Sequence, residues 1–129
     1  MHAIDTSLLY ALFDEADKWH EDAGRLVQEH RPVAVPPGTL QETLDLLAFR
    51  HGPKAARAAE AWLAAQDAVL VAGDDAGRSF DRGLALFREE EGLSFADAWC
   101  VAHALVLEVP LLTKDRRQEA AWRVRRRAG

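Results

Sequence analysis

Four short apolar runs, each bordered by segments with helical spacing, constrain the fold of this chain more than any other feature. The runs are His2–Asp5, Val33–Val35, Ala68–Ala72 and Val109–Thr113. Short apolar runs bounded by turn residues or by the start of helical spacing indicate β-strands. Because helices separate these strands, right-handed crossovers and a mostly parallel sheet are expected. The sequence predicts an α/β fold whose central sheet has four strands, or five if the C-terminal segment adds one.

Helical spacing of apolar side chains fills most of the remaining sequence. Near the start, Leu8, Leu9, Leu12 and Phe13 share this spacing, so the residues after Asp5 are expected to be helical. Further helices are predicted at residues 17–29, 39–50, 54–66, 75–90 and 94–108. No internal repeat or low-complexity linker divides the chain, and residues 1–129 are expected to form a single domain.

The C-terminal segment, residues 116–129, is basic, and its sequence fits two structures. Residues 118–127 fit a helix, whereas Trp122 and Val124 alternate with arginines as they would in an edge strand. Residues 114–129 hold seven Lys or Arg against two acids, although the whole chain has a net charge of −5. A basic end on an acidic body predicts a polyanion or an acidic protein as partner.

Composition limits the class of protein and of site. The apolar stretches fall short of the roughly 18 residues that a membrane span needs, and the N-terminus lacks a basic segment followed by an apolar run. A cytoplasmic protein without membrane association is therefore expected. The only cysteine, Cys100, cannot form an internal disulfide and is expected in the core. The five histidines lack the spacing of zinc proteases, so zinc is not expected.

Four acidic residues are predicted to lie at one edge of the sheet. Asp5 ends the first strand and Glu42 opens the helix after the second. Asp115 follows the fourth strand, and Asp97 lies in the first turn of a helix that enters from the same edge. Ligands of an open parallel sheet bind beyond the carboxyl ends of its strands. The four carboxylates are therefore expected to converge on a candidate site.

Each acid taken alone has a simpler explanation as part of a helix cap. Asp5 and Asp115 can each cap the helix that follows, Thr39-x-x-Glu42 matches a capping box, and Ser94-x-x-Asp97 is close to one. Four acids at one edge repel one another unless a cation neutralises them, so metal binding explains the set better than capping does. Mg²⁺ or Mn²⁺ suits oxygen ligands and bridges to phosphates, which predicts phosphodiester hydrolysis without a covalent nucleophile.

Several other residues carry weaker hypotheses. Asp74 and Asp75, in a turn before a helix, are minor alternatives for the acidic cluster. Arg116 and Arg117 stand beside Asp115, where they are candidates for holding a polyanionic backbone, with a solvated tail as the equal alternative. Trp122 is the one tryptophan in a basic context, where base stacking is worth considering, although core or interface packing is the commoner role.

The acidic positions lie in motifs that resemble those of the PIN-domain family, especially its VapC-type toxins. The motifs are Ile4-Asp5-Thr6-Ser7-Leu8-Leu9, Glu42 after the second strand, Leu93-Ser94-Phe95-Ala96-Asp97-Ala98 and Pro110-Leu111-Leu112-Thr113-Lys114-Asp115. Each motif is short, but their order and spacing over about residues 3–116 are specific. The resemblance implies a three-layer α/β/α fold and an endoribonuclease that depends on Mg²⁺ or Mn²⁺.

The resemblance also implies roles for particular residues and partners. The acidic positions of the family correspond to Asp5, Glu42, Asp97 and Asp115. The hydroxyl groups expected to position these carboxylates without binding the metal themselves are those of Thr6, Ser7 and Thr113. RNA would be the substrate, a cognate antitoxin the protein partner, and a homodimer the common assembly. The sequence departs from the family pattern after Asp115, where Arg116-Arg117 replaces a frequent aromatic residue and no closing strand is evident.

Two other functions remain open from the sequence. One is a catalytically inactive RNA-binding or protein-binding module whose acids are caps and whose basic tail makes the contacts. The other is a PIN nuclease that is not a toxin and acts in RNA processing or DNA repair. A small antitoxin gene directly upstream would distinguish a toxin from such a nuclease.

Overall fold

The central sheet is built from four short apolar strands that all run in the same direction. In this computed structural model, which describes residues 1–66, 69–71 and 76–128, the strands are β1 (His2–Ile4), β2 (Val33–Val35), β3 (Val69–Val71) and β4 (Leu111–Leu112). Their order is β3-β2-β1-β4, with every neighbouring pair parallel. This confirms the four-stranded parallel sheet, and the carboxyl ends of all four strands therefore meet at one edge.

Seven helices connect and follow the strands in the part of the chain that is described. They are α1 (Thr6–Leu12), α2 (His20–Glu29), α3 (Pro37–His51), α4 (Pro53–Ala65), α5 (Ala76–Glu89), α6 (Phe95–Leu107) and α7 (Arg116–Ala128). The sequence predicted each of these helices except α7, which it left ambiguous. Residues 116–128 are helical, so the edge strand considered for the basic C-terminal segment is wrong.

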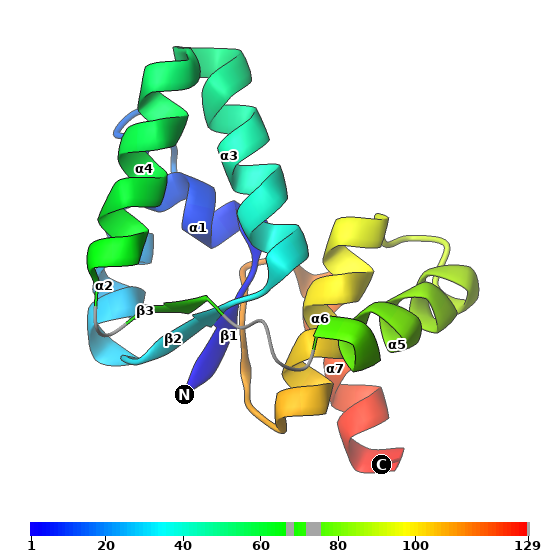
Figure 1. Cartoon of the computed structure of the whole chain (residues 1–129). Coiled ribbons are helices and arrows are strands. Elements are labelled where there is room, and N and C mark those ends of the chain that lie inside the picture. The colour runs from blue at the N-terminus through cyan, green and yellow to red at the C-terminus, as the bar shows by residue number, and fades with distance from the viewer. Residues whose placement is uncertain (67–68, 72–75, 129) are drawn as a thin grey trace.

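Helices pack on both faces of the sheet, as Figure 1 shows. One core cluster joins side chains of α1, α2 and α4 to β1, β2 and Leu112. A second cluster joins α5, α6 and α7 to Leu111. The adjacent residues Leu111 and Leu112 thus point to opposite faces, as successive side chains of a strand must. The structure is a three-layer α/β/α arrangement with a hydrophobic core on each face of the sheet.

Two predicted helix starts are shifted for identifiable reasons. The second helix begins at His20 and not at Asp17, because the Asp17 carboxylate accepts a hydrogen bond from the Trp19 N–H at 2.8 Å and forms a turn there. The third begins at Pro37 and not at Thr39, since proline is well suited to the first helical position. Both shifts leave the order of elements unchanged.

A tight turn at Gly52 joins α3 to α4, and the two helices form the hairpin that rises from the sheet in Figure 1. Gly52 has φ +94°, a left-handed conformation that favours glycine, and Pro53 then starts α4. No helix among the described residues combines the length and apolar character that a membrane span requires. Asp74 and Asp75, the minor alternatives for the acidic cluster, lie outside the described residues.

Candidate active site

Three strand ends and one helix start bring the predicted acids to the same edge of the sheet. Asp5 directly follows β1, and its backbone N–H donates to the carbonyl of Leu112 on the neighbouring β4 at 3.2 Å. Asp115 lies three residues beyond β4, Glu42 is in the second turn of α3, and Asp97 is in the first turn of α6. The parallel topology accounts for this placement, because the loops that leave parallel strands all lie at the carboxyl edge.

Asp5 is the central residue of the site and is completely buried. Its Oδ1 accepts a hydrogen bond from the Leu8 N–H at 3.0 Å, which caps α1. Its Oδ2 accepts from the Thr113 hydroxyl and, at 3.2 Å, from Nε2 of Gln118. Burial, followed by the charges of Asp97 and Asp115, raises the pKa of Asp5 to about 6 against the lowering effect of its hydrogen bonds with Thr113 and Leu8. The Asp5 carboxylate therefore lies close to two other acids.

Asp97 connects Glu42 to the rest of the cluster. Its pKa is also raised, first by burial and then by the charges of Glu42 and Asp115. Glu42 does not contribute to the shift of Asp5, so it lies at the far end of the group, next to Asp97. The charges of Asp97 and Asp115 act on Asp5, and those of Glu42 and Asp115 act on Asp97, so the structure brings the four predicted acids to the same region.

Helix capping and clustering turn out to be compatible at most of these positions. Asp5 caps α1, and Oδ1 of Asp115 accepts hydrogen bonds from the N–H groups of Arg117 at 2.8 Å and Gln118 at 3.5 Å. The Ser94 hydroxyl accepts from the Asp97 N–H at 3.2 Å, as the capping interpretation predicted. The predicted box at Thr39 is wrong, because the cap of α3 is Pro36 and Thr39 lies inside the helix.

The residues expected to support the acids divide into two groups. Thr113 links two members of the cluster, since its hydroxyl donates to Asp5 and accepts from the Asp115 N–H at 2.9 Å. Thr6 is buried and Ser7 is exposed. Within the described residues, neither of these two hydroxyls has a hydrogen bond to the four carboxylates.

Gln118 is a functional candidate that the sequence did not identify. Its side chain is 1% exposed and its Nε2 donates to Asp5, and within the described residues its buried Oε1 has no hydrogen-bond partner. The sequence does contain a signal that Gln118 is buried. If the segment is helical, Gln118 shares one helix face with the apolar residues Ala121 and Trp122. This signal could not be used, because the sequence left open whether the segment is a helix or an edge strand.

The charges around the four acids favour a cation that the protein itself does not supply. None of the ion pairs among residues 1–66, 69–71 and 76–128 involves Asp5, Glu42, Asp97 or Asp115. Lys114 instead pairs with Asp22 at 3.3 Å and lies over the Trp19 ring, and Arg117 donates to the Gly92 carbonyl at 3.2 Å. A partly buried, all-oxygen group without a protein cation fits a hard divalent ion in charge and donor type.

The same residues are not arranged as a finished metal site. Across the described part of the chain, no three Asp, Glu, His or Cys side chains are grouped closely enough to hold one ion. The fit to Mg²⁺ or Mn²⁺ therefore rests on the donor set and its charge. Bringing three carboxylate oxygens to one ion would require side-chain rotations at the partly exposed Glu42, Asp97 and Asp115.

Other predicted residues lie near this edge with different surroundings. Arg116 is exposed, whereas Arg117 is held against Gly92. Trp122 packs against the second core cluster, with the Arg126 guanidinium 5.0 Å from its ring centre, which favours a structural role over base stacking.

Cys100 is in the core as predicted, and burial, reinforced by Asp5, holds the pKa of its thiol well above the ordinary value. The thiol therefore stays protonated and is no nucleophile.

Comparison with known proteins identifies the family to which this fold and these motifs belong. The family model for the PIN domain matches residues 3–123. VapC20 of Mycobacterium tuberculosis, a sarcin-ricin loop cleaving toxin, has a similar structure with a TM-score of 0.79 and 30% sequence identity, and the match covers 94% of this chain and 95% of that chain. A toxin–antitoxin complex from Klebsiella pneumoniae matches with a TM-score of 0.68 and 20% identity over 93% of this chain and 91% of that chain. The comparison with curated proteins gives no match. Because the family match spans nearly all of its length, this chain belongs to the PIN domain family.

Proposed function

We propose that this chain is a divalent-metal-dependent endoribonuclease and the toxin of a type II toxin–antitoxin pair. The observation that carries the proposal is the buried Asp5 carboxylate, whose pKa is raised by burial and by the neighbouring Asp97 and Asp115. Such a group is unfavourable in an isolated fold and is relieved by a bound cation. Strongly perturbed carboxyl groups at the ligand-binding edge of a sheet are typical of functional sites.

In this proposal, Asp5, Glu42, Asp97 and Asp115 hold Mg²⁺ or Mn²⁺ and are the catalytic residues. A bound ion of this kind would supply activation of water and neutralisation of charge on the scissile phosphate. Thr113 and Gln118 orient the Asp5 carboxylate through the two hydrogen bonds to its Oδ2, so that it presents a fixed oxygen. Thr6 and Ser7 shape the start of α1 behind Asp5.

RNA is the proposed substrate on the basis of similarity and charge. The relative with 30% identity is a toxin that cleaves the sarcin-ricin loop, which is a property of that protein. We propose that the exposed Arg116, together with Arg117, contacts the phosphate backbone, because both directly follow Asp115 in the sequence. We propose that residues 1–129 act together as one nuclease domain.

The proposed partners are a cognate antitoxin and a second copy of this chain. The structural similarity to a toxin–antitoxin complex supports the first of these. A small protein encoded directly upstream, purified together with this chain, should abolish its cleavage of RNA. Absence of such a gene would leave the nuclease proposal intact and favour a PIN nuclease that is not a toxin.

A catalytically inactive binding module is the second candidate, and one observation favours it. Among the described residues, no three potential ligands are grouped closely enough for one ion. This alternative predicts RNA binding that persists in EDTA, with no cleavage under any condition.

The deciding experiment is cleavage of mixed RNA by purified protein in Mg²⁺, Mn²⁺ or EDTA, with an Asp97→Asn variant in parallel. The proposal predicts cutting that requires metal and is lost in the variant, because Asn keeps the size of Asp97 and removes its charge. Binding without cutting, equal in EDTA and in metal, would favour the inactive module instead.

A further inference from the structure

Lys114 is a basic residue that lies between two members of the candidate active site, yet it pairs with none of the four acids. It occupies the bend between Thr113, whose hydroxyl donates to Asp5, and Asp115. In the part of the chain that the structure describes, no ion pair joins Lys114 to the acidic cluster. A flexible ammonium next to uncompensated carboxylates is drawn toward them by its charge, so another interaction must hold Lys114 elsewhere.

The Lys114 ammonium is held at the start of α2 by one carboxylate and one aromatic ring. Its Nζ lies 3.3 Å from Oδ2 of Asp22 and 5.0 Å from the ring centre of Trp19. Trp19 is half-buried and packs against the first core cluster, so its ring is a fixed surface. The ion pair and the cation–π contact together direct the Lys114 side chain toward α2.

Asp22 is the decisive part of this arrangement, because the Trp19 ring is shared between two cations. The Lys18 ammonium lies 5.2 Å from the same ring centre, and the two like charges oppose each other. The Asp22 carboxylate offsets this repulsion, since its Oδ2 pairs with Lys114 while its Oδ1 accepts from Arg25 at 3.2 Å. Without the Asp22 charge, the ring alone would hold Lys114 only weakly.

The acidic cluster is where a released Lys114 side chain would find its strongest attraction. An ammonium there would interact with several carboxylates at once, and those carboxylates have no other cation among the described residues. The next two basic residues are placed differently, because Arg116 is exposed in the first turn of α7 and Arg117 donates to the Gly92 carbonyl. Lys114 precedes the helix and has a flexible four-carbon stem. Its ammonium in the cluster would take the place of a metal ion.

We propose that Asp22 and Trp19 are positioning residues that hold Lys114 out of the acidic cluster and so keep the cluster open for a divalent cation. This inference rests on the proposed function, in which the cluster holds Mg²⁺ or Mn²⁺. It adds that metal affinity depends on residues of α2 outside the four carboxylates. If Lys114 occupied the cluster for about nine-tenths of the time, the metal would bind about tenfold more weakly.

The test is a double-mutant cycle between Asp22 and Lys114, read by titration calorimetry with Mn²⁺. Asp22→Asn keeps the size of the side chain and removes its charge, and Lys114→Met removes the ammonium and keeps most of the stem. Glu21→Gln is the matched control, because it removes an equal charge from the neighbouring, exposed position of α2. The titration contains no RNA, so the readout does not depend on cleavage.

The inference predicts that Asp22→Asn lowers the affinity for Mn²⁺ about tenfold, whereas Lys114→Met and Glu21→Gln bind like the parent. Adding Lys114→Met to Asp22→Asn should restore the affinity, which a fold damaged by Asp22→Asn could not do. If both single variants weaken binding and the double variant is no better, Lys114 supports the loop and the inference is wrong. Parent-like binding by Asp22→Asn, or an equal loss in Glu21→Gln, would overturn it as well.

A crystal structure of metal-free Asp22→Asn separates this inference from the proposed function. Nζ of Lys114 should lie within about 4 Å of a carboxylate oxygen of the cluster. If it does so although the parent binds no Mn²⁺ and cuts no RNA, the ribonuclease proposal fails and the role of Asp22 in holding Lys114 stands. If Lys114 stays on Trp19 while the parent binds Mn²⁺, the ribonuclease proposal stands and the inference fails.

Discussion

At the scale of single residues, Asp5 performs two tasks with opposite effects on stability. As the cap of α1 it accepts the Leu8 N–H, a contribution typically worth about 1 kcal/mol. As a buried acid beside Asp97 and Asp115 it resists ionisation, and its pKa rises to about 6. In the proposed function, Asp5 would therefore serve metal binding at a cost to the stability of the metal-free fold.

The stability of the metal-free protein should depend on pH through Asp5. Its folded pKa lies above the ordinary value of 3.8, so the folded state binds the proton more tightly. The free energy of unfolding should therefore fall by up to about 3 kcal/mol as the pH rises from the ordinary value through about 6. Urea unfolding in EDTA at a series of pH values measures this free energy. Asp5→Asn is the control, and its free energy of unfolding should lack the decrease that is due to Asp5. An Asn variant with the same pH dependence would contradict the assignment.

Gln118 should act on Asp5 and not on the fold alone. Among the described residues, Gln118→Leu leaves Thr113 as the only side-chain donor to Oδ2 of Asp5, and loss of such an orienting contact typically lowers metal affinity or activity about 10- to 100-fold. The readouts are the cleavage rate and the rise in melting temperature as Mn²⁺ is added. Gln28→Leu, at an exposed position on α2, is the matched control. A variant with unchanged metal response and only lower stability would show a purely structural role.

At the scale of elements, the sequence predicted most of the secondary structure because the local signals agreed with the packing. Gly52 and Pro53 marked the turn between α3 and α4, and Ser94 marked the start of α6. The basic C-terminal segment was ambiguous because Trp122 and Val124 fit two periodicities. The contacts of α7 with the second core cluster decide in favour of the helix, and such long-range packing is not visible in a local pattern.

Close packing of α5 on α6 gives a test at this scale. Gly→Ala within a helix normally stabilises by about 0.5–1 kcal/mol. At Gly83, however, a Cβ would lie 3.0 Å from Cα of Trp99, so Gly83→Ala should destabilise by about 1–3 kcal/mol. Gly24→Ala in α2, where nothing lies within 4 Å, should show the normal gain. Chemical denaturation of the two variants measures the difference, and a gain at both positions would contradict the packing.

At the scale of the whole molecule, the rule for parallel sheets predicted where the acids would gather. The four acids do gather there, since the charges of Asp97 and Asp115 act on Asp5 and that of Glu42 acts on Asp97. The distances that a metal site needs could not be predicted, because they depend on side-chain rotations that backbone topology does not set. The buried Gln118 could not be placed either until α7 was known to be a helix.

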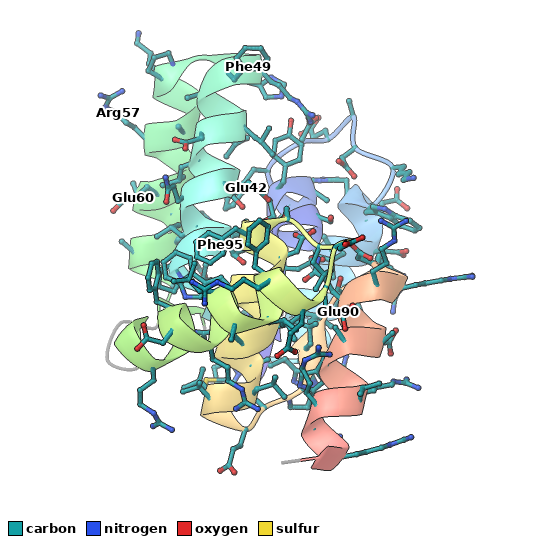
Figure 2. The ribbon with its side chains drawn as sticks, turned by 90° about the vertical axis from the view of Figure 1, so that its right-hand side faces the viewer. Glu42, Phe49, Arg57, Glu60, Glu90 and Phe95 are labelled. Carbon is teal, nitrogen blue, oxygen red and sulfur yellow. The ribbon has the colours of Figure 1, made fainter. Side chains whose placement is uncertain are left out.

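If the basic C-terminal segment contacts RNA phosphates, its arginines should contribute to the salt dependence of RNA binding. Each phosphate contact contributes about 0.9 to the slope of log K against log salt on duplexes and about 0.7 on single strands. Arg116→Ala, beside Asp115, should therefore lower the magnitude of the slope by about 1 and weaken binding to all sequences alike. Arg57→Ala, exposed on α4 and labelled in Figure 2, is the control that should leave the slope unchanged. Equal effects of the two substitutions would contradict a backbone contact at Arg116.

The most direct test of the acidic cluster compares cleavage and stability in one variant, Asp5→Asn. Asn keeps the helix cap, and rotation of the Gln118 amide would let its Oε1, which has no partner in the described part of the chain, accept from the new NH₂ group. The account predicts that Asp5→Asn loses metal-dependent RNA cleavage yet is about 1–3 kcal/mol more stable than the metal-free parent near neutral pH. Cleavage that survives in Asp5→Asn, or a variant that is inactive only because it is unfolded, would contradict it.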